Sequence, residues 1–184
     1  MGKTKKRKDA KKANVYELPC VSIRLVKDPP LLSPEPIRTT QDAVRLLADK
    51  LQNLDREVFG VVCLKNGAVP ICMNIVSVGT LSATLSHPRE IMKSAILANA
   101  DSVLAFHNHP SGNLEPSRED VAVTDLLLYA CELMRIDLKD HVIIGPDEEH
   151  YFSFRDNHVL DTLADGHGDL EIAENVADLS DRWK

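Results

Sequence analysis

The chemistry in this sequence gathers in one segment, residues 107–120, which reads HNHPSGNLEPSRED. His107 and His109 lie two residues apart at the end of an apolar stretch, and in a strand this spacing points both imidazoles to the same side. Neutral imidazoles in apolar surroundings still need partners for their ring nitrogens. A zinc ion would satisfy both rings, so the pair is a candidate metal-binding element.

Asp120 can supply a third, anionic ligand. Pro110, Ser111 and Gly112 turn the chain sharply, and a helix is expected to start at Ser117 with Asp120 in its first turn. Two histidines and one carboxylate with an open fourth position are typical of a catalytic zinc site. The alternative is that Ser117 caps the helix and Asp120 complements its dipole. Both can hold together, with the backbone of Ser117 capping and its hydroxyl facing the metal.

The elements that position this segment follow from the hydrophobic pattern. The sequence predicts a strand over residues 21–25, a proline-rich connector, and a helix that begins with Thr40 as N-cap. A hairpin turn at Asn66-Gly67 joins strands over 57–64 and 69–78. Further along, helices are expected over 88–98 and 117–134, and strands over 102–107, 141–145 and 151–154. Interleaved strands and helices predict an α/β or α+β fold with a single mixed sheet flanked by helices.

Composition limits the class of protein. The 184 residues are 43% hydrophobic and 27% charged, the balance of a soluble globular protein with a core. No apolar run approaches the ~18 residues of a membrane span, and no apolar stretch follows the basic N-terminus as in a secretory signal. The cysteines are scattered without short paired spacing, so we expect buried free thiols in a reducing, cytoplasmic setting; they are Cys20, Cys63, Cys72 and Cys131.

Charge divides the chain into a central domain and two tails. Residues 1–12 hold seven basic groups and one acid, and residues 161–184 hold seven acids and two basic groups. We therefore expect a basic disordered tail over 1–14, a strand and proline-rich linker over 15–37, a domain over 38–158 and an acidic tail over 159–184. The basic tail is either simply solvated or a contact for nucleic acid.

The central segment resembles a known family. The pattern His107-x-His109, seven intervening residues, then Ser117-x-x-Asp120 is similar to the JAMM motif of JAB/MPN-domain zinc metalloproteins. The surrounding sequence, from VSVGTLSATLSHPRE through HNHPSGNLEPSRED to DHVIIG and YFSFRD, resembles the RadC-like branch over residues 38–158. This resemblance implies a cytidine deaminase-like architecture and one zinc ion per chain, held by His107, His109 and Asp120.

The resemblance also implies roles for two further residues. Glu57 matches the upstream glutamate of the family motif, which acts as general acid and base; without the resemblance, it would be interpreted as a solvated strand end. Ser117 would help to stabilise the oxyanion. The implied activity is a zinc metallopeptidase or isopeptidase acting on a protein or peptide substrate.

Two other hypotheses remain open at this stage. One is a DNA-repair or mobile-element accessory protein that contacts nucleic acid through the basic tail. The other is a non-catalytic scaffold that keeps the metal. The longer members of the resembled branch carry an N-terminal helical region, whereas this chain has about 37 residues before the domain, so a separate DNA-contacting module is not expected.

Overall fold

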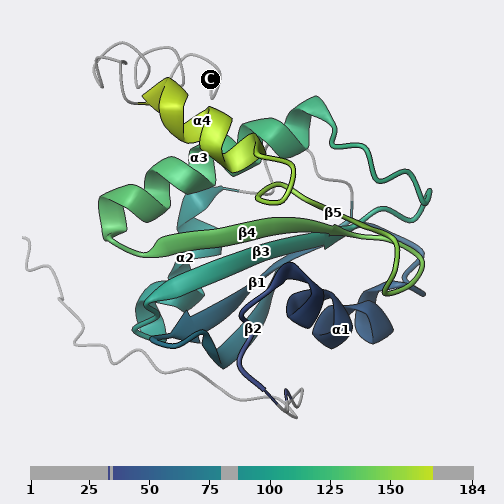
Figure 1. The fold of residues 1–184 in the computed structure, drawn as a ribbon, viewed down its shortest axis with the longest axis horizontal. Helices are drawn as coiled ribbons and strands as arrows, with labels where there is room; N and C mark the ends of the chain where they lie inside the picture. Colours follow the sequence, from purple (N-terminus) through teal and green to yellow (C-terminus); the bar gives the residue numbers. More distant parts are fainter. Residues whose placement is uncertain (1–32, 34, 80–86, 168–184) are drawn as a thin grey trace, which may run out of the picture.

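The structure is a computed structural model that describes residues 33, 35–79 and 87–167 (Figure 1). These residues form five strands and four helices. In chain order they are α1 (Thr40–Leu51), β1 (Val58–Lys65), β2 (Val69–Val78), α2 (Pro88–Leu97), β3 (Ser102–Asn108), α3 (Arg118–Met134), β4 (Asp137–Ile144), β5 (Tyr151–Ser153) and α4 (Val159–His167).

The strands make one mixed sheet in the order β2-β1-β3-β4-β5. β1 pairs with β2 and with β3 in antiparallel fashion, β3 pairs with β4 in parallel, and β4 pairs with β5 in antiparallel fashion. A parallel pair needs a long crossover, and α3 provides it between β3 and β4. The predicted mixed sheet flanked by helices is confirmed.

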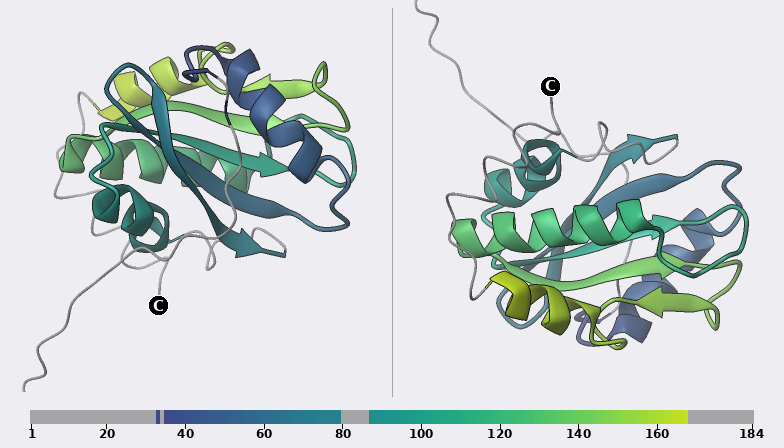
Figure 2. Two further views of the ribbon diagram at one scale, coloured as in Figure 1. Left: turned by 90° about the horizontal axis from the view of Figure 1, so that it is seen from below. Right: turned by 90° about the horizontal axis from the view of Figure 1, so that it is seen from above.

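Helices cover both faces of the sheet, so the central strand β3 is buried along its whole length. Viewed from above, α3 crosses in front of the strands and α1 lies behind them (Figure 2, right). In β3, Leu104 and Phe106 pack in the cluster that contains α1, whereas Val103 and Ala105 pack in the cluster that contains α2 and α3. This alternation is the period-two geometry of a strand buried on both faces.

Helix α1 begins one residue earlier than the sequence suggested. Thr39, not Thr40, is the N-cap: its side chain accepts from the Asp42 backbone N–H, and the Asp42 side chain accepts from the Thr39 backbone. Thr40 is the first helical residue and is buried, and its hydroxyl donates to Asp140 on β4, 2.9 Å away. The prediction of Thr40 as the cap was wrong: Asp42 lies three residues after Thr39 and completes its capping box, whereas Ala43, three residues after Thr40, cannot.

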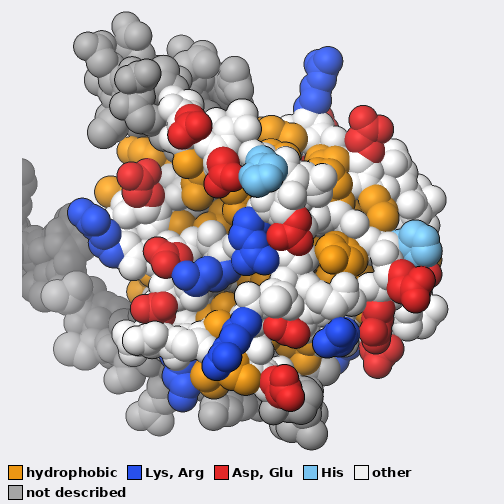
Figure 3. All heavy atoms as spheres, viewed as in Figure 1, with side chains coloured by type: hydrophobic (Ala, Val, Ile, Leu, Met, Phe, Trp, Pro, Cys, Tyr) orange, Lys and Arg blue, Asp and Glu red, His pale blue; other side chains and the backbone are white. Residues whose placement is uncertain are grey.

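The face of the molecule seen in Figure 1 carries charges of both signs. Lysine and arginine side chains are interspersed with aspartate and glutamate over this face, without a continuous area of one sign (Figure 3). Exposed ion pairs among the described residues include Lys139 with Asp137 on β4 and Arg155 with Asp156 after β5. Exposed pairs of this kind contribute little to stability, so the fold depends on its interior.

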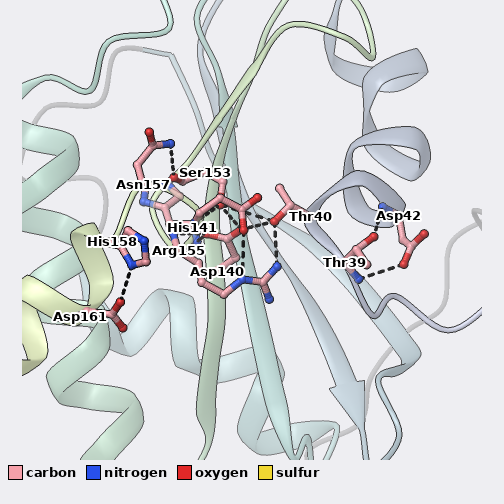
Figure 4. A network of polar contacts seen from close by, with 11 residues as sticks. Thr39, Thr40, Asp42, Asp140, His141, Ser153, Arg155, Asn157, His158 and Asp161 are labelled. Atoms are coloured by element: carbon pink, nitrogen blue, oxygen red, sulfur yellow. Dashed lines mark hydrogen bonds and ion pairs between the residues drawn. The ribbon is translucent and has the colours of Figure 1, made fainter.

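Asp140 on β4 is the centre of a buried polar network (Figure 4). Its Oδ2 accepts from the hydroxyls of Thr40 (2.9 Å) and Ser153 (2.6 Å), and its Oδ1 accepts from the backbone N–H groups of His141 (2.8 Å) and Arg155 (3.0 Å). Burial raises the pKa of this carboxyl, and the hydrogen bonds oppose that shift. The network joins α1, β4 and the segment after β5.

Residues 159–167, which the sequence analysis placed in the acidic tail, form α4. Leu160 is 7% exposed and packs with Ile143 of β4 and Phe154. The acidic composition of the segment obscured the apolar side that makes this contact.

Several predictions fall outside the described residues: the basic tail, the strand over 21–25, the proline-rich linker as far as residue 32, the acidic tail beyond 167, and Cys20. Within the described part, Cys63, Cys72 and Cys131 are free thiols; Cys63 and Cys131 are buried as predicted, whereas Cys72 is only half-buried. None of the described helices combines the length and the apolar character that a membrane crossing requires.

The Asp140 network predicts a large stability difference between two substitutions on one strand. Asp140→Leu removes the acceptor for four buried or half-buried donors and should lower the free energy of unfolding by about 3 kcal/mol. Asp137→Leu changes the same residue type at an exposed position of β4 and should have an effect near zero. Urea denaturation of the metal-free protein measures both. Equal effects for the two variants would show that the network does not stabilise the fold.

Candidate metal centre

Strand β3 positions the two histidines. His107 is fully buried in β3, and His109 follows one residue after the strand ends, with its side chain 11% exposed. Their Nε2 atoms lie 3.0 Å apart. Between them, the amide of Asn108 accepts from the Val58 backbone N–H (2.8 Å) and donates to the Arg56 carbonyl (3.1 Å). This pair of bonds fastens the end of β3 to the start of β1 and holds the histidines in place.

Helix α3 brings Asp120 to the histidines. Its Oδ1 lies 3.2 Å from the Nε2 of His107, and its Oδ2 lies 3.5 Å from the Nε2 of His109. Asp120 is third in the helix, and its backbone and side chain form a reciprocal capping box with Ser117. The structure therefore brings together all three predicted metal ligands, and their ligand atoms lie within 4.8 Å of one another.

The loop between β3 and α3 fixes the orientation of His109. Gly112 has a φ of 74°, a conformation that favours glycine, and its N–H donates to the His109 carbonyl. The turn brings the carbonyl of Asn113 to within 2.5 Å of the His109 Nδ1. Because a carbonyl only accepts, Nδ1 carries a hydrogen, which leaves Nε2 as the ring nitrogen that faces Asp120 and could bind a metal.

The site is built around a negative charge. Burial raises the pKa of Asp120, but hydrogen bonds with His107 and His109 outweigh burial and place that pKa well below its usual range. The carboxylate in turn raises the pKa of His109, chiefly through their hydrogen bond. In the described part of the chain, no lysine or arginine forms an ion pair with Asp120.

These donors fit a divalent transition metal. A carboxylate that is 1% exposed needs a positive partner, and the groups that face it are two imidazoles rather than a permanent cation. Two imidazole nitrogens and one carboxylate oxygen form a donor set that suits zinc and leaves a fourth position open. Among the residues that the structure describes, this is the one group of three such side chains close enough to hold a metal.

Glu57 lies at the same end of the interior strands, at the start of β1. It directly precedes β1, where Phe59 pairs with His107 of the antiparallel strand β3. Its backbone carbonyl accepts from the Gly79 N–H, a hydrogen bond that joins the two strands at the end of the β1–β2 hairpin away from the turn. The side chain is half-buried, and its charge helps to raise the pKa of His109. The structure thus places Glu57 beside the cluster, while its role in proton transfer stays a prediction.

Ser117 performs the capping function that was one of its two interpretations. Its hydroxyl accepts from the Asp120 backbone N–H (3.1 Å) and donates to the Asp120 Oδ2 (2.6 Å). The residue itself is exposed. The capping interpretation is confirmed, and the oxyanion role stays a prediction.

The sequence analysis missed two residues that contact this cluster. His141 was expected to begin a strand, but β4 already begins at Asp137, and His141 lies within it, fully buried. Its Nε2 is 2.8 Å from the His107 Nδ1, and its Nδ1 is 2.6 Å from the hydroxyl of Thr124 on α3. Burial lowers the pKa of His141 well below its usual value.

A signal for these residues is present in the sequence. A histidine inside the apolar run HVIIG needs a hydrogen-bonding partner once it is buried. Thr124 lies four residues after Asp120, on the same side of an expected helix. What the sequence does not provide is the register of β3 and β4, which pairs Ala105 with His141 and so places His141 diagonally across from His107.

Comparison with known proteins agrees with the fold. Residues 37–159 match the family model of the RadC-like JAB domain. A UPF0758 protein of Rubrobacter xylanophilus is 47% identical over 124 residues, which are 67% of this chain and 53% of that protein. UPF0758 proteins of Clostridioides difficile (44% over 119 residues, 65% and 50%) and Methanosarcina barkeri (36% over 151 residues, 82% and 63%) are also similar. The chain spans about half the length of the first two relatives.

The cluster predicts that the charge of Asp120 is needed for metal binding. Asp120→Asn keeps the volume of the side chain but removes the anionic ligand, so the protein should go from about one zinc ion per chain to almost none after dialysis. Glu119→Gln is the matched control, because it removes the same charge from the adjacent, exposed residue of α3. Elemental analysis of both variants measures the difference. Full zinc loading of Asp120→Asn would contradict the assigned ligand.

Proposed function

The chain belongs to the RadC-like JAB domain family, and we propose that it is a zinc-dependent hydrolase that cleaves amide bonds in a protein or peptide substrate. The observation that carries this proposal is the convergence of His107, His109 and Asp120 at the end of the central strand β3, with Glu57 at the start of the neighbouring strand. The names of the similar proteins state no activity, so the proposal rests on the chemistry of these side chains.

His107, His109 and Asp120 would hold the ion through two ring nitrogens and a carboxylate oxygen. A zinc ion in such a site lowers the pKa of a bound water towards about 7 and polarises a substrate carbonyl. His107 and Asp120 are buried, whereas His109 is partly exposed, so the substrate would approach from the side of His109.

Glu57 would act as the general base and then as the general acid. Its carboxylate would accept a proton from the attacking water and return it to the nitrogen of the leaving amine. Two features support this role: the start of β1 holds Glu57 next to the end of β3, and its charge acts on His109. General acid–base groups of this kind contribute about 10²–10⁴ to the rate.

Ser117 would stabilise the developing negative charge on the substrate oxygen. Its hydroxyl hydrogen is directed at the Asp120 Oδ2, so it must rotate towards the substrate to act as a donor. The exposure of Ser117 supports this movement. A single oxyanion donor is worth about 2.7–4 kcal/mol in other hydrolases.

A nucleic-acid partner has less support. That hypothesis depends on the basic residues 1–12, which lie outside the described part of the chain. The face shown in Figure 3 mixes both signs of charge and offers no continuous basic surface for phosphates. The contact through the tail and the non-catalytic scaffold stay predictions.

Replacement of Glu57 tests catalysis of peptide cleavage separately from metal binding. Glu57→Gln removes the base but no metal ligand, so zinc content should be unchanged while cleavage falls at least about 100-fold. Cleavage is measured with a fluorogenic peptide library, with and without a chelator, and Glu119→Gln is again the control for loss of one nearby charge. Chelator-sensitive cleavage by Glu57→Gln at the wild-type rate would refute the role of Glu57.

A further inference from the structure

Each metal-binding histidine must carry its hydrogen on the correct nitrogen. A neutral imidazole has one N–H and one lone pair, and only the nitrogen with the lone pair can bind a metal. In this site both rings face the cluster with Nε2, and these two atoms are 3.0 Å apart. Metal binding therefore requires the hydrogen of each ring to be on Nδ1.

The two rings meet this requirement by different means. His109 donates Nδ1–H directly to the carbonyl of Asn113, which can only accept. His107 instead faces another imidazole, because its Nδ1 lies 2.8 Å from the Nε2 of His141. An imidazole nitrogen can donate or accept, so this contact alone does not determine which ring carries the hydrogen.

Thr124, the next residue in the chain of hydrogen bonds, determines whether His107 or His141 is the donor. The Thr124 hydroxyl lies 2.5 Å from the backbone carbonyl of Asp120 and 2.6 Å from the Nδ1 of His141. The carbonyl only accepts, so the single hydroxyl hydrogen of Thr124 goes to it. Thr124 must then accept from His141, which places the hydrogen of His141 on Nδ1.

The surroundings of His141 determine the last step in this chain of hydrogen bonds. The ring is fully buried, stacked on Phe154 with ring centres 4.7 Å apart and in edge contact with Phe59 at 5.5 Å. These apolar neighbours favour a neutral ring with a single N–H. With its hydrogen on Nδ1, His141 accepts at Nε2, so His107 donates Nδ1–H, and Nε2 is the nitrogen that a metal can bind in place of a hydrogen directed at Asp120.

We infer that Thr124 and His141 are positioning residues that set the tautomer of His107, through a chain of hydrogen bonds that begins at the Asp120 backbone. The inference rests on the proposed function in one respect only, that the cluster binds a metal. Because Thr124 lies four residues after Asp120, the same turns of α3 supply one ligand and the group that orients another. Residues that hydrogen-bond to the second ring nitrogen of a metal-binding histidine generally strengthen metal binding in this way.

The hydroxyl of Thr124 can be removed with little change of shape. In Thr124→Val, the Nδ1–H of His141 loses its acceptor, and the ring can instead carry its hydrogen on Nε2 and donate to His107. His107 then carries its own hydrogen on Nε2, where the hydrogen blocks the metal. Thr124→Ser keeps the hydroxyl and is the matched control.

Two measurements on the full chain test the inference. Competition with a chromophoric chelator gives the zinc dissociation constant, which should rise about 10–100-fold in Thr124→Val and stay near the wild-type value in Thr124→Ser. Nitrogen-15 NMR of the metal-free proteins identifies the protonated ring nitrogen. Nδ1 of His107 should carry a hydrogen in wild type and Thr124→Ser, and should lose it partly or wholly in Thr124→Val.

A Thr124→Val protein with wild-type zinc affinity and an unchanged His107 tautomer overturns the inference. If that variant does not fold, His141→Phe provides the second test, because a phenyl ring suits the space between Phe59 and Phe154 but cannot accept from His107. It should also weaken zinc binding, and unchanged affinity would again overturn the inference. Neither measurement uses a substrate, so a zinc-loaded wild type without hydrolytic activity would refute the proposed function and leave this inference standing.

Discussion

The buried carboxylate of Asp120 is the constraint on which the site depends. A negative charge that is 1% exposed is costly unless positive groups compensate it, and the side chains that face Asp120 are the imidazoles of His107 and His109. In the metal-free protein these rings and the Ser117 hydroxyl share the charge through hydrogen bonds. A divalent cation would satisfy the same carboxylate more completely, and this is why a local arrangement of acid and imidazoles is evidence for a metal centre.

The order and direction of the strands bring the residues of the site together. Antiparallel pairing of β1 with β3 brings Glu57, at the start of one strand, beside the histidines at the end of the other. The parallel pairing of β3 with β4 requires the crossover helix α3, and the first turns of that helix carry Asp120 and Thr124. The parallel register also sets His141 against His107. Chain segments that are far apart in the sequence thus meet at one end of β3, whereas the Asp140 network holds α1 on the opposite face.

What the sequence could predict depended on how local the interaction is. His107, His109 and Asp120 lie within 14 residues, and the rules for strand alternation and helix capping act over such distances, so their convergence was predictable. The hydrogen bonds of His141 with His107, and of Thr40 with Asp140 100 residues away, depend on strand register and helix docking, which no local pattern contains. The helical state of residues 159–167 also depends on packing, because Leu160 packs against Ile143 and Phe154. The choice of Thr39 as helix cap, in contrast, has a local signal, because Asp42 lies three residues later and completes the capping box.

The most direct test of the metal centre is X-ray absorption at the zinc edge of the zinc-loaded protein in solution. The account predicts a first shell of about four nitrogen and oxygen atoms at roughly 2.0–2.2 Å, with the outer-shell scattering of two imidazoles. A first shell that contains sulfur at about 2.3 Å would instead assign the ion to cysteines, and a shell of oxygen atoms alone would exclude both histidines. Either result would contradict the claim that His107, His109 and Asp120 hold the ion.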